Sequence, residues 1–119
     1  AKMYKQLLKH QQNGDHIVIV SASVDIYLKD IAELLEVDLI CTEAEISNNQ
    51  FTGLYATPDC SNIQKKTRIL EKYELSLYDL VYAYGNSKED LAMLSLADYT
   101  YMVGVDTHLP KIQQQKKLA

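Results

Sequence analysis

The stretch that decides the fold is Leu80-Val81-Tyr82-Ala83-Tyr84-Gly85-Asn86-Ser87-Lys88-Glu89-Asp90, followed by Leu91-Ala92-Met93-Leu94. An apolar run ends in a glycine turn, and a second run follows with helical character. This order predicts a parallel strand over residues 80–84 and a helix over 87–95. It places Asn86, Ser87 and Asp90 at the carboxyl end of the strand, where open α/β sheets bind their ligands. Oxygen ligands at such an edge suit Mg²⁺ and phosphate chemistry.

The rest of the chain alternates in the same way. Apolar spacing and β-branched runs predict helices over residues 2–12, 26–35 and 62–73, and strands over 16–20, 37–41 and 99–103. Ser23 or Asp25 would cap the second of these helices. Residues 43–55 resemble a hairpin around Asn48-Asn49-Gln50. The expected fold is α/β, a mostly parallel Rossmann-like sheet flanked by helices. We expect a core domain over residues 1–104 and a polar tail over 105–119.

The composition excludes several classes of function. The chain has 119 residues, 47% of them hydrophobic, and a net charge of −4 without a block of five like charges, so we expect no nucleic-acid partner. No apolar run approaches the roughly 18 residues of a membrane span, and no secretory signal is visible, so we expect a cytoplasmic protein without a membrane partner. Cys41 and Cys60 lack metal-ligand spacing, and we expect reduced thiols.

Polar residues at three separate places have the chemistry of a phosphoryl-transfer site. The hydroxyl of Ser21 and the amide of Ala22, at the turn after a strand, can hold phosphate oxygens. Lys65, at the start of a helix, can neutralise phosphoryl charge. Each residue also has a purely structural interpretation: Ser21 as a turn cap, Lys65 as a solvated charge, and Asp90 as a first-turn carboxylate favoured by the helix dipole.

Taken in order, three segments resemble motifs two, three and four of the haloacid dehalogenase (HAD) superfamily. They are Ile17-Val18-Ile19-Val20-Ser21-Ala22-Ser23, Cys60-Ser61-Asn62-Ile63-Gln64-Lys65-Lys66-Thr67-Arg68-Ile69, and Tyr84-Gly85-Asn86-Ser87-Lys88-Glu89-Asp90. The nearest similarity is to the phosphoserine-phosphatase-like branch, and it covers roughly Met3 to Gly104. The resemblance implies an HAD-like core.

The resemblance also implies a role for each matching residue. Ser21, with Ala22, would bind the transferring phosphoryl group. Lys65 would pair with the nucleophile and phosphate, with Lys66 as the alternative if the motif is shifted by one residue. Asn86 falls where the family has a Mg²⁺-binding aspartate, and Asp90 matches the second acidic position. The implied cofactor is Mg²⁺, the implied metal ligands are Asn86 and Asp90, and the implied catalytic residues are Lys65 and Asp90.

The chain departs from the family pattern in lacking an Asp-x-Asp pair, whose first aspartate is the family's nucleophile. The resemblance therefore implies the C-terminal core part of a Mg²⁺-dependent phosphatase that hydrolyses a phosphomonoester through an aspartyl-phosphate, and an inactive isolated chain. The central first strand of the sheet, between the strands at 16–20 and 80–84, would be missing. We expect this slot to be filled by the protein's own N-terminal segment, by another copy, or by re-pairing of the flanking strands.

Two other functions remain open at this point. The chain can be a non-catalytic module that binds phosphate or docks a strand. It can also be a receiver-like signalling domain, although the acidic pocket of such a domain is not apparent. For the enzyme, the partner is a small phosphorylated substrate whose identity the sequence does not give.

Overall fold

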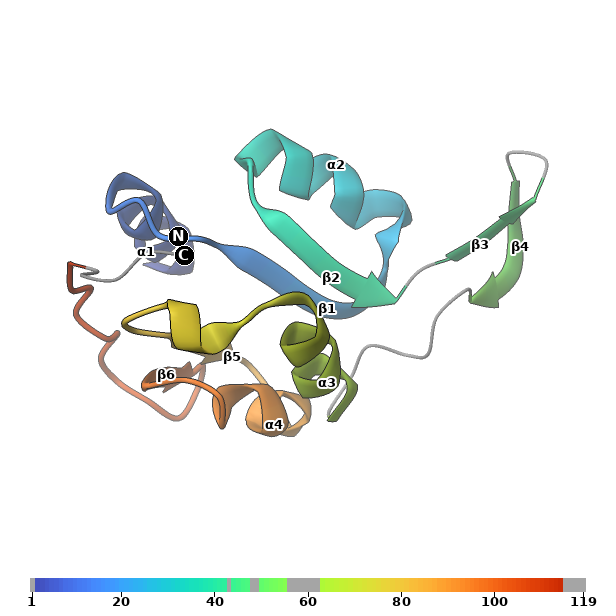
Figure 1. Cartoon of the computed structure of the whole chain (residues 1–119). Coiled ribbons are helices and arrows are strands. Elements are labelled where there is room, and N and C mark those ends of the chain that lie inside the picture. Colours follow the sequence, from blue (N-terminus) through green and yellow to red (C-terminus); the bar gives the residue numbers. More distant parts are fainter. Residues whose placement is uncertain (1, 43, 48–49, 56–62, 115–119) are drawn as a thin grey trace.

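The computed structural model describes residues 2–42, 44–47, 50–55 and 63–114. Cys60 lies outside these ranges. In chain order the elements are α1 (Lys2–Gln12), β1 (Val18–Val24), α2 (Asp25–Leu35), β2 (Asp38–Thr42), β3 (Ala44–Ser47), β4 (Gln50–Tyr55), α3 (Ile63–Lys72), the 3₁₀ turn η1 (Leu75–Leu77), β5 (Tyr82–Gly85), the 3₁₀ turn η2 (Lys88–Asp90), α4 (Leu91–Leu94) and β6 (Tyr99–Met102) (Figure 1).

The strands form three two-stranded sheets in the described part of the chain. β1 pairs with β2 and β5 pairs with β6, both in parallel, whereas β3 and β4 form the expected antiparallel hairpin. The α/β class with parallel strands and flanking helices is therefore confirmed. The flanking strands β1 and β5 belong to different sheets, so re-pairing between them is not how this structure is built.

Some boundaries differ from the expectation. The turn predicted at residues 21–23 is wrong, because β1 continues to Val24 with an irregularity after Ser21. The helix predicted over 87–95 is divided into η2 and the short α4. The apolar spacing in α3 predicts burial of Ile63 and Leu70, but they are 57% and 49% exposed. The reason is that the buried residue of α3 is Lys65, so the inward face of this helix is centred on a charge.

Contacts at both strand ends show that β1 and β5 run in the same direction. At the amino ends, Nδ1 of His16 lies 3.0 Å from the hydroxyl of Tyr78, and these residues precede β1 and β5 respectively. At the carboxyl ends, α3 reaches both sheets, since Arg68 donates to the carbonyl of Cys41 in β2 and Lys65 contacts Asp90 beyond β5. All four strands of the two parallel pairs thus end at one edge of the molecule.

A second connection between the sheets is α1, which covers a face of tyrosine rings. Tyrosines occupy alternate positions of β5 and β6, so four tyrosine rings lie on one face of this sheet. We call this surface the tyrosine face, and its residues are Tyr82, Tyr84, Tyr99 and Tyr101. The segment over residues 107–113 lies on the same face, with the amide of Gln113 donating to the hydroxyl of Tyr82 at 2.8 Å. Lys2 of α1 donates to the hydroxyl of Tyr101 at 3.3 Å.

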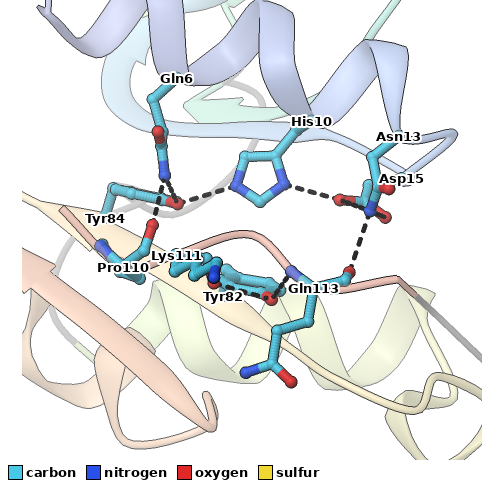
Figure 2. A network of polar contacts seen from close by, with 9 residues as sticks. All are labelled: Gln6, His10, Asn13, Asp15, Tyr82, Tyr84, Pro110, Lys111 and Gln113. Atoms are coloured by element: carbon cyan, nitrogen blue, oxygen red, sulfur yellow. Dashed lines mark hydrogen bonds and ion pairs between the residues drawn. The ribbon is translucent and has the colours of Figure 1, made fainter.

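Figure 2 shows the polar network that fixes α1 on the tyrosine face. Buried His10 joins two partners: its Nδ1 lies 2.7 Å from a carboxylate oxygen of Asp15, and its Nε2 lies 2.8 Å from the hydroxyl of Tyr84. Buried Gln6 donates to the same hydroxyl at 3.0 Å and to the carbonyl of Pro110 at 2.9 Å. Burial raises the pKa of Tyr84, so its hydroxyl is protonated at neutral pH. The network thus holds α1, β5 and the C-terminal segment together.

We expect Tyr84→Phe to lower the free energy of unfolding by about 1–3 kcal/mol, because it removes the hydroxyl that serves both His10 and Gln6 and leaves buried polar atoms without that partner. Urea denaturation at pH 7 measures the change. Tyr4→Phe is the matched control, since Tyr4 is 54% exposed on α1 and its loss of a hydroxyl should stay within about 0.5 kcal/mol. Equal effects in the two variants would contradict the role given to the network.

Candidate functional site

A buried ion pair lies at the carboxyl edge of β5. Lys65, in the first turns of α3, and Asp90, at the end of η2, are only 7% and 3% exposed. Nζ of Lys65 donates to Oδ1 of Asp90, and the backbone amide of Asn86 donates to Oδ2 at 2.8 Å. Two segments separated by 25 residues in sequence are therefore joined by one carboxylate.

The local sequence brings Asp90 back onto the strand end. Ser87 caps the turn by accepting a hydrogen bond from the amide of Glu89 at 3.3 Å, and its carbonyl accepts from the amide of Asp90 at 3.0 Å. A Cβ atom at Gly85 would lie 2.7 Å from Cβ of Asp90. The glycine is therefore required by the close approach of the aspartate, and any larger residue would push Asp90 away from Lys65.

The electrostatics of Asp90 favour its ionised form. Burial raises the pKa of this carboxyl group, but the hydrogen bonds from Lys65 and from the amide of Asn86, together with the lysine charge, outweigh burial, so the pKa lies below its ordinary value of 3.8. At neutral pH the site holds a buried carboxylate and a buried ammonium group.

The structure relates the other candidate residues to this pair in different ways. Ser21 is half-buried in β1, opposite Cys41 in the β1–β2 register, and the carbonyl of Cys41 accepts from Arg68, one helical turn after Lys65. Ser21 thus lies on the neighbouring strand at the end contacted by α3. Ala22 follows in the irregular part of β1, and its side chain is outside the described set. Between the two lysines, the buried one is Lys65.

The candidate metal ligands stay a prediction. The part of the chain that the structure describes contains no group of three His, Cys, Asp or Glu side chains able to hold a metal ion. Asn86 is exposed and adjoins Asp90 through its backbone amide. The two side chains would supply two oxygen ligands, and Mg²⁺ is commonly held by one or two carboxylates with waters and substrate phosphate completing the octahedron. Asn86 and Asp90 are therefore compatible with Mg²⁺ where waters and substrate phosphate supply the other ligands.

Sequence reasoning missed residues that connect the elements at both ends of the parallel strands. Arg68 lies one turn after Lys65, so the helical period would have placed both on one face of α3. No signal in the sequence paired His16 with Asp38, whose carboxylate lies 2.6 Å from Nε2 of the histidine and accepts from the hydroxyl of Tyr73 at 2.5 Å. These two hydrogen bonds, that from Tyr73 foremost, hold the pKa of Asp38 below its ordinary value. The cluster fastens the amino ends of the strands, opposite the candidate site.

We expect Asp90→Asn to destabilise the protein by about 3–5 kcal/mol, because the ammonium of Lys65 is left buried without its countercharge. Urea denaturation at pH 7 measures this loss. Glu89→Gln is the control, since it removes an exposed carboxylate from the adjacent position and should change stability by less than about 0.5 kcal/mol. The double variant Lys65→Met/Asp90→Leu should recover part of the loss, because an apolar pair needs no countercharge, while the amide of Asn86 still loses its acceptor. An Asp90→Asn protein as stable as the parent would contradict the pair's importance.

The ion pair of Lys65 and Asp90 should make the free energy of unfolding depend on pH. The pKa of Asp90 is lower in the folded than in the unfolded protein, so its contribution to stability is complete above pH 3.8, the ordinary value, and is lost as the pH falls through the folded value. Chemical denaturation between pH 6 and pH 2 should show a steeper loss for the parent than for Lys65→Met/Asp90→Leu. Parallel curves would show that Asp90 is not the titrating group.

Comparisons with known proteins agree with this geometry. The structure superimposes on a solved protein of unknown function from Bordetella pertussis Tohama I with a TM-score of 0.74 and 22% identity, over 81% of this chain and 46% of that one, which shows a shared fold. A histidinol-phosphatase from Neisseria meningitidis serogroup C (strain 8013) is 29% identical over 114 residues, which cover 90% of this chain and 51% of the relative. The chain spans about half the length of both. The model of the haloacid dehalogenase-like hydrolase family matches residues 2–95, and the chain therefore belongs to this family.

Proposed function

We propose that this chain forms the phosphate-binding part of a phosphatase that hydrolyses a phosphomonoester through an aspartyl-phosphate intermediate. The observation that carries the proposal is the buried ammonium of Lys65, held by Asp90 at the carboxyl edge of parallel strands. A buried cation at this edge is suited to attract and stabilise a phosphoryl group, because electrostatic stabilisation dominates phosphoryl transfer. Membership of a hydrolase family that includes a phosphatase relative supports the same reaction class.

Each residue has a distinct task in this proposal. The ammonium of Lys65 has three protons, one of which is donated to Asp90, so the others remain available for phosphoryl oxygens or an attacking carboxylate. Asp90 fixes the ammonium in position. The hydroxyl of Ser21 and the amide of Ala22 would bind phosphoryl oxygens from the neighbouring strand end. A bound Mg²⁺, held by Asn86 and Asp90, would neutralise further charge on the phosphate.

The attacking group is a carboxylate that this chain does not supply as an Asp-x-Asp pair. In the proposed reaction a carboxylate oxygen forms a bond to phosphorus while the ester P–O bond breaks, and the leaving alkoxide takes a proton from a neighbouring acid. Water then attacks the acyl phosphate, which releases inorganic phosphate and restores the carboxylate. In this proposal Lys65 would meet such a carboxylate at the end of a strand between β1 and β5.

The relative's name suggests a substrate class. A histidinol-phosphatase acts on histidinol phosphate, the phosphate monoester of a small amino alcohol. We propose for this protein a small phosphorylated alcohol as the substrate.

The test is a phosphate-release assay with p-nitrophenyl phosphate and histidinol phosphate, on this chain and on the longest product of its reading frame. The longer product should hydrolyse a phosphomonoester in the presence of Mg²⁺, and the 119-residue chain should not. Lys65→Met should lower kcat of the active product about 10²–10³-fold, as expected for loss of one charge-stabilising group, and Ser21→Ala should raise KM.

Lys66→Met is the matched control, because Lys66 follows Lys65 on the same helix. It should leave kcat within a factor of about two. The reverse order of the two lysine variants would move the role to Lys66, and a longer product that releases no phosphate from either ester would contradict the proposed function.

A further inference from the structure

A chain of hydrogen bonds beneath the C-terminal segment, residues 107–113, begins and ends on that segment (Figure 2). At one end, Nε2 of Gln6 donates to the carbonyl of Pro110 at 2.9 Å, and at the other end Nδ2 of Asn13 donates to the carbonyl of Gln113 at 3.0 Å. Between Gln6 and Asn13 the links are, in order, Tyr84, His10 and Asp15. Every buried side-chain nitrogen and oxygen in the described ranges has a partner, so a change at one link must be compensated at another.

The donors and acceptors fix the direction of each link. The carboxylate of Asp15 only accepts, so Nδ1 of His10 carries the proton between them. Nε2 of neutral His10 is then an acceptor, and it receives the hydroxyl proton of Tyr84. Burial raises the pKa of Tyr84, which keeps that proton on the hydroxyl, and the hydroxyl oxygen in turn accepts from Gln6. Neutral His10 thus satisfies the chain of hydrogen bonds from end to end.

A second proton on His10 reverses the central link. Nε2 then donates to the oxygen of Tyr84, and the hydroxyl proton must find another acceptor. The other neighbour of the hydroxyl in the chain is the amide group of Gln6, which offers its oxygen only if it turns over. Once turned over, this amide group also faces Pro110 with its oxygen, so the carbonyl of Pro110 loses its donor.

Burial decides which group loses its partner. Gln6 and His10 are 4% and 8% exposed, so a hydroxyl proton without an acceptor between them is costly. Pro110, in contrast, is half-buried and precedes the exposed Lys111. A small movement of the C-terminal segment would bring the Pro110 carbonyl into contact with water, which can replace the lost donor.

We propose that His10 is a proton-sensitive latch, which holds the C-terminal segment at Pro110 when the imidazole is neutral and releases this point when it is protonated. Histidine is suited to the task, because its charge changes between about pH 5 and pH 8. The attachment at Gln113 is kept in both states, since Asp15 accepts from Nδ1 of His10 with or without the added proton. The latch does not depend on the phosphatase chemistry proposed above.

The ionisable groups around His10 come from three parts of the chain. Asp15 follows α1, and the rings of Tyr82 and Tyr84 on β5 lie with their centroids 4.9 and 5.7 Å from that of the imidazole. The C-terminal segment carries Lys111 and His108, which are both exposed. Because the second of these is also an imidazole, the test has to separate its titration from that of His10.

The experiment is an NMR titration of the 119-residue chain from about pH 8 to pH 5. The ring nitrogens of His10 report its protonation, and the carbonyl carbon of Pro110, detected through the amide of Lys111, reports its hydrogen bond. The Pro110 signal should shift toward lower frequency with the same midpoint as His10, while the carbonyl signal of Gln113 stays in place. The buried ion pair does not interfere, because the pKa of Asp90 lies below 3.8.

Three variants locate the proton and the path. His10→Gln should abolish the shift of the Pro110 signal, because it removes the titrating group. His108→Gln is the matched control, since it removes an exposed imidazole from the C-terminal segment itself, and it should leave the shift unchanged. In Tyr84→Phe, His10 should still titrate while the Pro110 signal remains constant, because the hydroxyl that links them is gone.

The titration of the parent protein decides the inference even if a variant fails to fold. A His10 that keeps one protonation state over this range, or a Pro110 signal that does not follow its midpoint, would overturn the latch. Equal movement of the Gln113 and Pro110 signals would show detachment of the whole segment and overturn the directional relay. A shift that is lost in His108→Gln, or that persists in Tyr84→Phe, would overturn the assignment to His10 or the path through the hydroxyl.

Discussion

The buried contact between Lys65 and Asp90 is the interaction on which the rest of the structure depends. An ammonium and a carboxylate that are both removed from water are stable only together, so α3 must sit where its first turns reach the end of β5. From that position Arg68, one turn later, reaches the carbonyl of Cys41 in β2. The ion pair thus sets the location of the helix that spans the two parallel sheets.

The position of α1 on the sheet of β5 and β6 depends on hydrogen bonds to tyrosine hydroxyls. The tyrosine face presents a polar atom at the tip of each ring, and α1 and the segment at 107–113 bind these tips. Gln11 of α1 donates to the carbonyl of Leu35 at the end of α2, so the helix also contacts the other half of the molecule. The polar ends of the rings fix a position that apolar packing alone would leave adjustable.

The two ends of the parallel strands have opposite characters. At the amino ends, the cluster of His16, Asp38 and Tyr73 is partly exposed and fastens loops together. At the carboxyl ends, the charges are buried and one of them is a lysine. A buried lysine is costly unless it is paired, and Lys65 lies paired at the edge where α/β proteins bind ligands, which is the basis of the proposed phosphate site. Within the described ranges, every helix is too short or too polar to span a membrane. Cys41, on β2, is a buried thiol.

The sequence by itself determined the α/β class and the order of the main elements, because apolar periodicity and capping chemistry are local properties. Lys65 and Asp90 are named through the resemblance to the family's motifs, and the contact between them was not predicted. The strand ending at Gly85, the turn at Ser87 and the helix carrying Lys65 all follow from neighbours in the chain. Only the tertiary structure decided that Lys65 is buried while Ile63 and Leu70 face solvent, and that His10 meets Tyr84 across 74 positions. It also decided that β1 and β5 belong to different sheets. Such contacts depend on how helices pack between sheets, and no local pattern encodes that geometry.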